Sequence, residues 1–230
     1  MTIATALADD PIAPAVVTDL DDLATLASDP AASARRACEV RVRAFGRQIW
    51  VRAAPPHTGS AAATVVRDDV ENDLSLATGR EDPVPSDLSP GPAWPDPADI
   101  DPGDRLLLRV EHDQHPAYCA WLARAAARAP GGWSLAPFCP SAGGLFRLHL
   151  IAAARLALPP GVRVEVRHDL HGVRLAQVAL GFGADTLSGP IDAARHLPLA
   201  GVPRPSETSH DALAELVRQA GLEPVTHPQS

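Results

Sequence analysis

Lysine is absent from the 230-residue chain, and all 20 of its basic residues are arginine. This absence excludes Schiff-base catalysis through a lysine amine. The formal net charge of -8 argues against a protein that follows nucleic-acid phosphates, because such proteins present a basic surface. No apolar run approaches the roughly 18–20 residues of a membrane-spanning helix. The N-terminal sequence lacks the basic start and apolar core of a secretory signal, so we expect a cytoplasmic protein.

Cysteine is scarce as well, since Cys38, Cys119 and Cys139 are the only three in the sequence. They lie far apart and form no CxxC pair, so neither a zinc ribbon nor a redox dithiol is expected. An iron–sulfur cluster held by four cysteines would need a fourth thiolate. We therefore expect buried free thiols, no cofactor and no metal centre.

Composition and hydrophobic pattern divide the chain into four parts. We expect a disordered tail at 1–17 and a lead-in helix with a β-hairpin at 18–53. A Pro-rich linker is expected at 54–103, and a half-barrel-like α/β domain at 104–230. The linker is predicted because seven prolines fall between Pro83 and Pro102, which excludes a continuous helix or a central strand. A short helix is expected within 61–76.

The lead-in part combines a helical pattern with an alternating one. Its leucines lie at helical spacing up to Asp29-Pro30, which is expected to end or interrupt the helix. The segment 38–53 (CEVRVRAFGRQIWVRA) then shows apolar alternation on both sides of Gly46. Such alternation around a glycine is typical of a β-hairpin.

From Asp104 onward, short apolar runs alternate with helical patterns. Strands are expected at 105–111, 133–138, 162–167 and 183–189, with helices at 115–129, 144–158 and 171–182. A last helix is expected to begin near Thr208, with Asp211 three residues on, and to stop at Gly221. The pattern predicts an α/β fold with a parallel sheet, a partial (βα) barrel of about four βα units or a small open sheet.

Four segments carry a family resemblance. They are LDDLATLASDPAASARRACEVRVRAFGRQIWVRA (20–53), IAAARLAL (151–158), AQVALGFGADTLSGP (176–190) and HDALAELVRQAGLEPVTHPQS (210–230). In this order and spacing the chain resembles the C-terminal part of the radical S-adenosylmethionine enzymes of menaquinone biosynthesis by the futalosine route. That family includes aminofutalosine synthase, dehypoxanthine futalosine cyclase and FO synthase. The resemblance implies a barrel of βα units.

The chain departs from this family where the radical chemistry would reside. In the family, the lead-in segment runs directly into a CxxxCxxC loop that holds the iron–sulfur cluster. Here APPHTGSAAATVVRDD follows, and no cysteine lies between Cys38 and Cys119. Thr186 and Pro190 also stand where the family has an aspartate and a threonine. The resemblance therefore implies a degenerate, non-catalytic accessory or metabolite-binding subunit of the menaquinone pathway, rather than a radical enzyme.

The loop that resembles the family supplies candidate ligand contacts, namely Asp185, Ser188 and Gly189. The alternative is that the glycines of this segment simply allow tight packing of helix on strand. A half-barrel would also leave two sheet edges and one apolar face open. We therefore expect self-association, or a complex with a complete radical enzyme of the same pathway.

Strand ends supply the candidates for the alternative function, a cluster-free hydrolase or isomerase. Glu111 and His112 follow one predicted strand, and His168 and Asp169 follow another. The carboxyl ends of strands are where α/β ligand sites lie, and an aspartate can orient a neighbouring imidazole for acid–base catalysis. Charged turns are nevertheless common at strand ends.

His112, His115 and Cys119 have the spacing of metal ligands, but they span the predicted start of a helix at Pro116. A continuous helix that stacks all three side chains is therefore not expected, and zinc would need a further ligand or water. A helix start with a buried cysteine is the favoured interpretation.

Overall fold

Strands and helices alternate along the second half of the chain, as the sequence pattern predicts. The computed structural model describes residues 29–57, 61–67, 80–83, 94–191 and 209–226. The alternating elements are β4 (Arg105–Arg109), α3 (His115–Arg128), β5 (Ser134–Phe138), α4 (Gly144–Ala157), β6 (Arg163–Arg167), α5 (His168–His171), α6 (Val173–Ala179) and β7 (Thr186–Gly189). The predicted strands and helices are thus confirmed in this part, with small differences at their ends.

A single open sheet of eight strands contains these strands, in the order β3-β2-β4-β5-β6-β7-β1-β8. The remaining strands are β1 (Gln48–Ala53), β2 (Ala63–Arg67), β3 (Arg80–Pro83) and β8 (Glu223–Thr226). The run from β4 to β8 is parallel, whereas β2 is antiparallel to both β3 and β4. The expected α/β class is confirmed, and the fold is compatible with a partial βα barrel whose sheet does not close.

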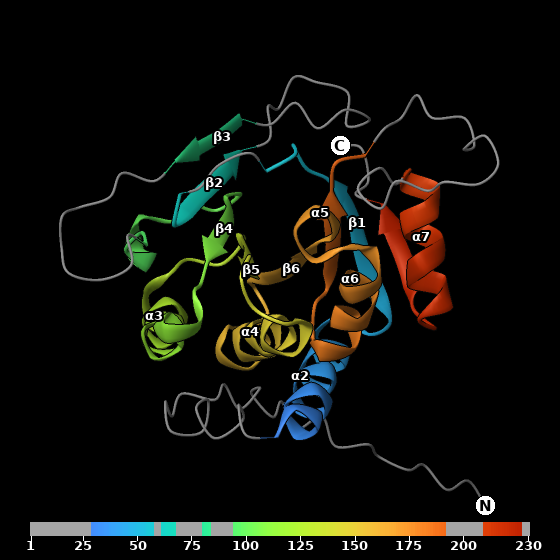
Figure 1. The fold of residues 1–230 in the computed structure, drawn as a ribbon, viewed down its shortest axis with the longest axis horizontal. Helices are drawn as coiled ribbons and strands as arrows, with labels where there is room; N and C mark the ends of the chain where they lie inside the picture. Colours follow the sequence, from blue (N-terminus) through green and yellow to red (C-terminus); the bar gives the residue numbers. More distant parts are fainter. Residues whose placement is uncertain (1–28, 58–60, 68–79, 84–93, 192–208, 227–230) are drawn as a thin grey trace, which may run out of the picture.

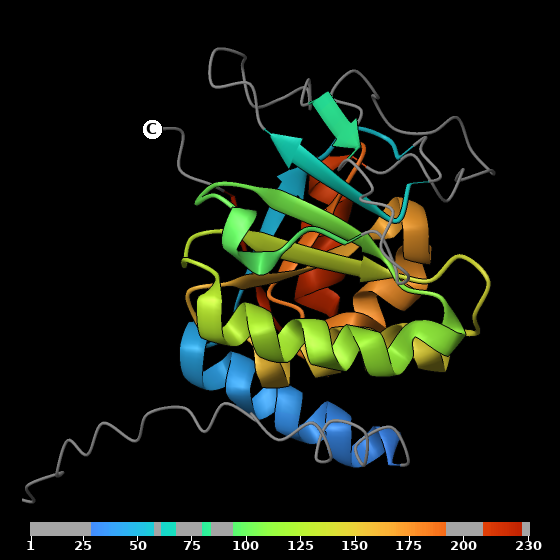
Figure 2. The same ribbon diagram turned by 90° about the vertical axis from the view of Figure 1, so that its left-hand side faces the viewer.

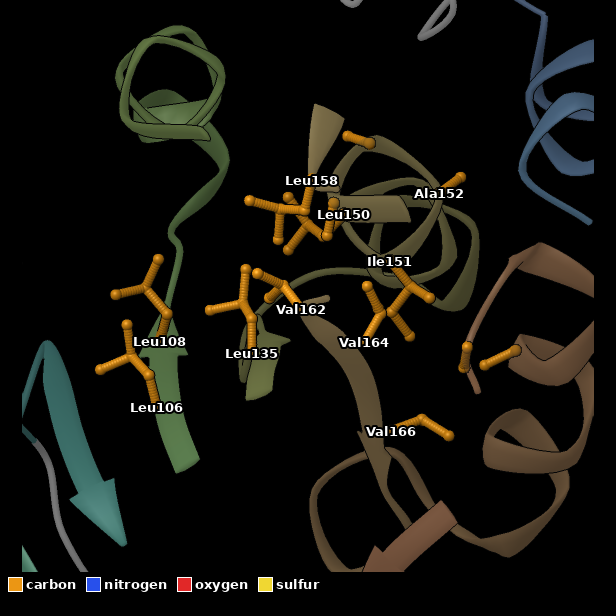
Figure 3. Close-up of a cluster of buried hydrophobic side chains, with 14 of the residues drawn as sticks. Leu106, Leu108, Leu135, Leu150, Ile151, Ala152, Leu158, Val162, Val164 and Val166 are labelled. Carbon is orange, nitrogen blue, oxygen red and sulfur yellow. The ribbon is translucent and has the colours of Figure 1, made fainter. Parts of the chain in front are cut away.

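Helices cover the outer side of the curved sheet. Figure 1 shows the strands along an arc with α3, α4, α6 and α7 outside it. The turned view in Figure 2 places α2 (Pro30–Phe45) beyond α4, as a further helix on the same side. Between sheet and helices lies the main apolar core, where leucines and valines of β4, β5 and β6 meet Leu150 and Ile151 of α4 (Figure 3). The inner, concave side of the sheet carries the buried polar side chains together with a second, smaller apolar cluster of Leu107, Ala136 and Phe138.

The predicted N-terminal β-hairpin is wrong, because its first half is part of helix α2. Asp29 caps this helix by accepting hydrogen bonds from the amides of Ala31 and Ala32, and Pro30 occupies its first turn. Proline is compatible with that position, since its missing N–H would have no partner there. Asp29-Pro30 therefore starts helix α2, whereas the helix predicted before it lies outside the described residues. The helix stops at Gly46, whose φ of 61° suits glycine, and the chain enters β1 directly.

Two strands lie within the segment predicted to be a linker. β2 occupies 63–67 of the range 61–76 in which a short helix was expected, so this part is a strand, which the β-branched Thr64 and Val65 favour; the rest of that range, 68–76, lies outside the described residues. The short 3-10 helix η1 (Pro97–Asp99) begins at Asp96, whose side chain accepts a hydrogen bond from the amide of Ala98. The expected tail at 1–17 lies outside the described residues.

The C-terminal part contains the expected helix and an additional strand. Helix α7 (His210–Gln219) begins at Ser209, whose hydroxyl accepts a hydrogen bond from the amide of Ala212; the predicted cap at Thr208 lies outside the described residues. Gly221, with a φ of 73°, turns the chain into β8, which the sequence pattern did not reveal. Within the part of the chain that the structure describes, no helix has the length and apolar character to cross a membrane.

Candidate functional site

The carboxyl ends of the parallel strands bring most of the predicted site residues to one edge of the sheet. In α/β sheets this edge is the usual place for ligands. Eight residues lie at this edge, either at the end of β4, β5, β6 or β7 or shortly after it. They are Glu111, His112, Cys139, Ser141, His168, Asp169, Ser188 and Gly189. They form separate groups of contacts, which differ in burial and in charge.

Glu111 lies just after β4 in a half-exposed cluster. Its Oε1 atom lies 2.6 Å from the guanidinium of Arg109, and its Oε2 accepts a hydrogen bond of 2.8 Å from the hydroxyl of Ser141. The buried thiol of Cys139 lies 3.9 Å from the same Oε2. Hydrogen bonds from Ser141 and Arg109 lower the pKa of Glu111 below its usual value. A carboxylate held in this way is a weak base.

Asp169, at the end of β6, binds the arginine two residues before it. Arg167 donates to both carboxylate oxygens, at 3.0 and 2.7 Å, and also to the carbonyl of Pro55. The backbone amide of His57, which follows β1, donates to the same carboxylate at 3.3 Å. Asp169 therefore joins the ends of β6 and β1 through Arg167 and the amide of His57, and its charge also acts on the neighbouring imidazoles of His168 and His171.

The two imidazoles near Asp169 are buried. His168 packs against Gly189 so closely that a methyl group on Gly189 would overlap the ring, and Gly189 has a φ of 145°. Burial lowers the pKa of His168. The Nδ1 atom of His171 lies 3.1 Å from the carbonyl oxygen of Arg167, and burial lowers the pKa of His171 to about 4. Both rings therefore belong to the packing of α5 against the sheet.

A buried polar network, which the sequence analysis missed, occupies the concave side of the sheet. Glu165 of β6 receives the guanidinium of Arg105 at 2.7 Å, the hydroxyl of Ser134 at 3.2 Å and the hydroxyl of Ser188. Burial alone would raise the pKa of Glu165, but Arg105 holds it at about 2. The alternation of VRVEVR already places Glu165 opposite the valines that face the helices, and this was the available signal.

Asp185 lies on the other side of the sheet, in the core under α4. Its carboxylate is fully buried, 2.9 Å from Arg155 and 3.4 Å from Arg163, and it accepts hydrogen bonds from the amide of Val164 and the hydroxyl of Thr186. Burial raises its pKa. Of the three predicted ligand contacts, Ser188 and Gly189 thus lie near the concave face, whereas Asp185 links β7 to the helix layer. Ligand binding by these residues stays a prediction.

The metal-like spacing of His112, His115 and Cys119 does not bring three side chains to one point. His112 stacks on Phe146 of α4, with ring centroids 4.5 Å apart. His115 instead meets His149 of α4 at 2.8 Å between the two Nε2 atoms, and the Cys119 thiol lies 3.7 Å from His115. Among the described residues, no group of three or more histidines, cysteines or acidic residues is arranged to hold a metal ion.

An iron–sulfur cluster of the kind that the futalosine-route radical enzymes carry does not fit this chain. Cys38 lies on α2, Cys119 on α3 and Cys139 after β5, and all three thiols are free. A cluster needs several thiolates around one point, and the three cysteines belong to different elements. No step of a mechanism is therefore assigned to such a group.

The concave face encloses a cavity of only about 10 Å³. That volume holds roughly one water molecule. Its walls are Arg105, Leu106, Leu107, Ala136, Glu165 and Arg167. As it stands, this cavity leaves no room for an organic substrate beside the Glu165 network.

The fold and these contacts define an open, barrel-like α/β protein whose concave face combines an internally hydrogen-bonded polar network with a small apolar cluster. No protein-family model and no curated protein matches the chain. The link to the futalosine-route enzymes therefore rests on the sequence phrases quoted above.

Proposed function

We propose that the chain is a non-catalytic relative of the futalosine-route radical enzymes, and that it serves menaquinone biosynthesis as an accessory or metabolite-binding subunit. The resemblance supplies the pathway, and the missing cysteine loop removes the radical chemistry. The observation that carries the proposal is that the carboxylates at the strand ends are bound to arginines of the same strands or loops. Glu111 is held by Arg109, and Asp169 by Arg167.

These pairs argue against the alternative, a cluster-free hydrolase or isomerase. A general base needs a pKa near the working pH and a carboxylate that can reach its substrate. The pKa of Glu111 is lowered instead, and Asp169 is occupied by Arg167 and the backbone. The imidazole of His168 is buried, and that of the exposed His112 stacks on Phe146 with ring centroids 4.5 Å apart, so of the two candidate imidazoles only His112 is open to a substrate.

Among the described residues β8 is the last strand of the sheet, and it is poorly suited to the addition of a further strand from any partner. Glu223 donates its amide hydrogen to the carbonyl of Arg47, toward β1. Because backbone groups alternate in direction along a strand, the next residue, Pro224, faces the open side. Proline has no N–H to offer there, and proline on an edge strand opposes strand addition. We therefore propose that association, with a complete radical enzyme of the pathway or with a second copy, uses a surface other than this edge.

The experiment combines turnover, binding and association on the purified full-length chain. Futalosine is added to the protein, and the products are followed by chromatography while binding is followed by calorimetry. The proposal expects no turnover, together with binding of the nucleoside or co-elution with a purified radical enzyme of the pathway. Turnover that is lost in both Glu111→Gln and Asp169→Asn would overturn it and favour the hydrolase. Absence of turnover, binding and co-elution would remove the accessory role as well.

A further inference from the structure

The contact between helices α3 and α4 contains a pair of imidazoles that the proposed function does not use. His115 is the first residue of α3, and its Nε2 atom lies 2.8 Å from the Nε2 atom of His149 on α4. A distance of this size is a hydrogen bond, in which one ring donates an Nε2–H and the other accepts it. The two rings therefore share one proton at this contact.

The second nitrogen of His149 determines which protonation states the pair can adopt. His149 is 6% exposed, and its Nδ1 atom is buried without a hydrogen-bond partner. A buried donor without an acceptor is costly. The neutral pair avoids this cost when His149 donates through Nε2–H and leaves its Nδ1 bare, while the half-buried His115 carries its own hydrogen on Nδ1.

One additional proton removes this arrangement. A singly protonated pair carries three N–H groups on four nitrogens, and only one of them fits between the two Nε2 atoms. Both Nδ1 atoms must then carry hydrogen, which places an unpartnered N–H at the buried Nδ1 of His149. Protonation of the pair is therefore incompatible with the closed contact, whichever ring receives the proton.

The surroundings offer the added charge little compensation. The titratable groups that face the pair are His112, from the 3-10 helix η2 (His112–Gln114), and the Cys119 thiol on α3. On α4, Phe146 contributes only its ring, and Arg147 is directed away, toward the carbonyls of Pro140, Ala142 and Leu170. Tyr118, at the same helix contact, donates its hydroxyl to the carbonyl of Leu150. These described groups include no carboxylate that would stabilise an imidazolium.

We propose that the His115–His149 pair is an acid-sensitive latch, which holds α3 against α4 while neutral and releases the start of α3 when it takes up a proton. η2 directly precedes His115, and Glu111 caps η2 through its backbone and side-chain contacts with Gln114. Release of His115 therefore loosens the loop that carries Glu111 at the functional edge of the sheet. The inference holds whether or not the proposed function is correct.

Amide hydrogen exchange tests the latch, with rates corrected for the intrinsic effect of pH. Between about pH 7.5 and about pH 5.5, protection at the start of α3 should fall about tenfold in the natural protein. His149→Phe keeps a ring in the same place but cannot take up a proton, so the fall in protection should be clearly smaller than in the natural protein, with only His115 of the pair left to titrate. The control His210→Asn removes an imidazole on helix α7, away from the contact between α3 and α4 (Figure 1), and should keep the natural pH response.

A second measurement covers the case in which His149→Phe does not fold. Nitrogen-15 spectra of the natural protein with labelled histidine should show His149 as the Nε2–H tautomer at about pH 7.5. An Nδ1–H tautomer, or protection at α3 that is unchanged at the lower pH, would overturn the proposal. So would binding of Zn²⁺ that depends on both histidines, because a metal ion would then hold the two rings together.

Discussion

Two buried arginine–carboxylate pairs lie on opposite sides of the same sheet and have different surroundings. Arg155 and Asp185 are both 0% exposed and lie on the helix side, 2.9 Å apart. Arg105 and Glu165 are 4% and 2% exposed and lie on the concave side, 2.7 Å apart. A buried ion pair is stabilising only if further hydrogen bonds satisfy its remaining donors and acceptors. The pairs meet this requirement in different ways.

On the helix side, the backbone supplies the further partners. Arg155 donates to the carbonyls of Leu158, Pro159 and Val162, and so fixes the turn from α4 to β6. On the concave side, serine hydroxyls and the carbonyl of Ala53 supply them, next to the small cavity. The first pair is therefore part of the packing of helix on sheet, whereas the second belongs to the face where a ligand would bind. The comparison predicts unequal effects of breaking them.

The largest effect is expected from Asp185→Asn. The substitution leaves the Arg155 guanidinium charged in a sealed part of the core, where no water can replace the carboxylate. We expect a loss of about 3–5 kcal/mol in the free energy of unfolding, measured by urea denaturation. The control is Glu215→Gln, which removes the exposed pair with Arg218 on α7 and should change stability by less than about 0.5 kcal/mol. Equal losses in the two variants would contradict the structural role of Asp185.

Glu165→Gln is expected to have a smaller effect, about 2 kcal/mol, because the guanidinium of Arg105 borders a small cavity and is slightly exposed, whereas that of Arg155 is sealed in the core. The adjacent cavity also has room for a water molecule near the guanidinium. The same denaturation experiment measures it. A loss as large as that of Asp185→Asn would show that the two pairs are equivalent, and would remove the distinction between the two faces.

The pH dependence of stability sharpens the comparison. The folded-state pKa of Glu165 is about 2, against an ordinary value of 4.5, so the unfolded chain binds the proton more readily. The stabilisation by this carboxylate is therefore complete above about pH 4.5 and is lost as the pH falls toward 2. Glu165→Gln should flatten this acid limb of the stability curve. An acid limb that is identical in the variant would show that Glu165 does not cause it.

A third substitution, at Arg163, changes the surroundings of the Arg155–Asp185 pair without removing either partner. The Arg163 guanidinium lies between the rings of Phe45 and Trp50, 4.3 and 3.9 Å from their centroids, and 3.4 Å from Asp185. Arg163→Gln removes the charge from this stack but leaves Arg155 in place. Cation–π contacts of a partly exposed arginine contribute about 1 kcal/mol, so a loss of about that size is expected by thermal denaturation. No loss at all would mean that Arg155 alone fixes Asp185.

The α/β architecture could be predicted from the sequence because its signals are local. The runs RLLLRVE and VRVEVR are short and apolar or alternating, and proline or glycine ends the helices between them. The hairpin prediction failed because alternation and helical spacing coexist in 38–45. Three features favour the helix. Asp29 caps it, a proline occupies its first position, and Ala37 and Arg41 are buried at helical spacing.

The candidate site was harder to predict, because its contacts join segments far apart in the chain. Nothing near Asp185 in the sequence reveals that Arg155, thirty residues earlier, is its partner. Likewise, the neighbouring letters of Asp169 suggested that it orients His168, whereas its carboxylate contacts Arg167 and the amide of His57. Glu165 and Arg167, two residues of the alternating strand β6, make the side-chain hydrogen bonds that connect this strand to its neighbours on the concave face. Alternation showed which side they face, but not their partners.

The smallest effect is expected at the exposed end of the concave side, from Ser141→Ala. The hydroxyl of Ser141 is the main cause of the lowered pKa of Glu111, and Arg109 is the second. Its removal should move the pKa of Glu111 upward, still below the ordinary value because Arg109 remains. Carbon-13 titration of the glutamate carboxylates measures this shift, and the melting temperature should not change, since the cluster is solvent-accessible. A clear loss of stability would instead place Glu111 with the two buried pairs, as a carboxylate on which the fold depends.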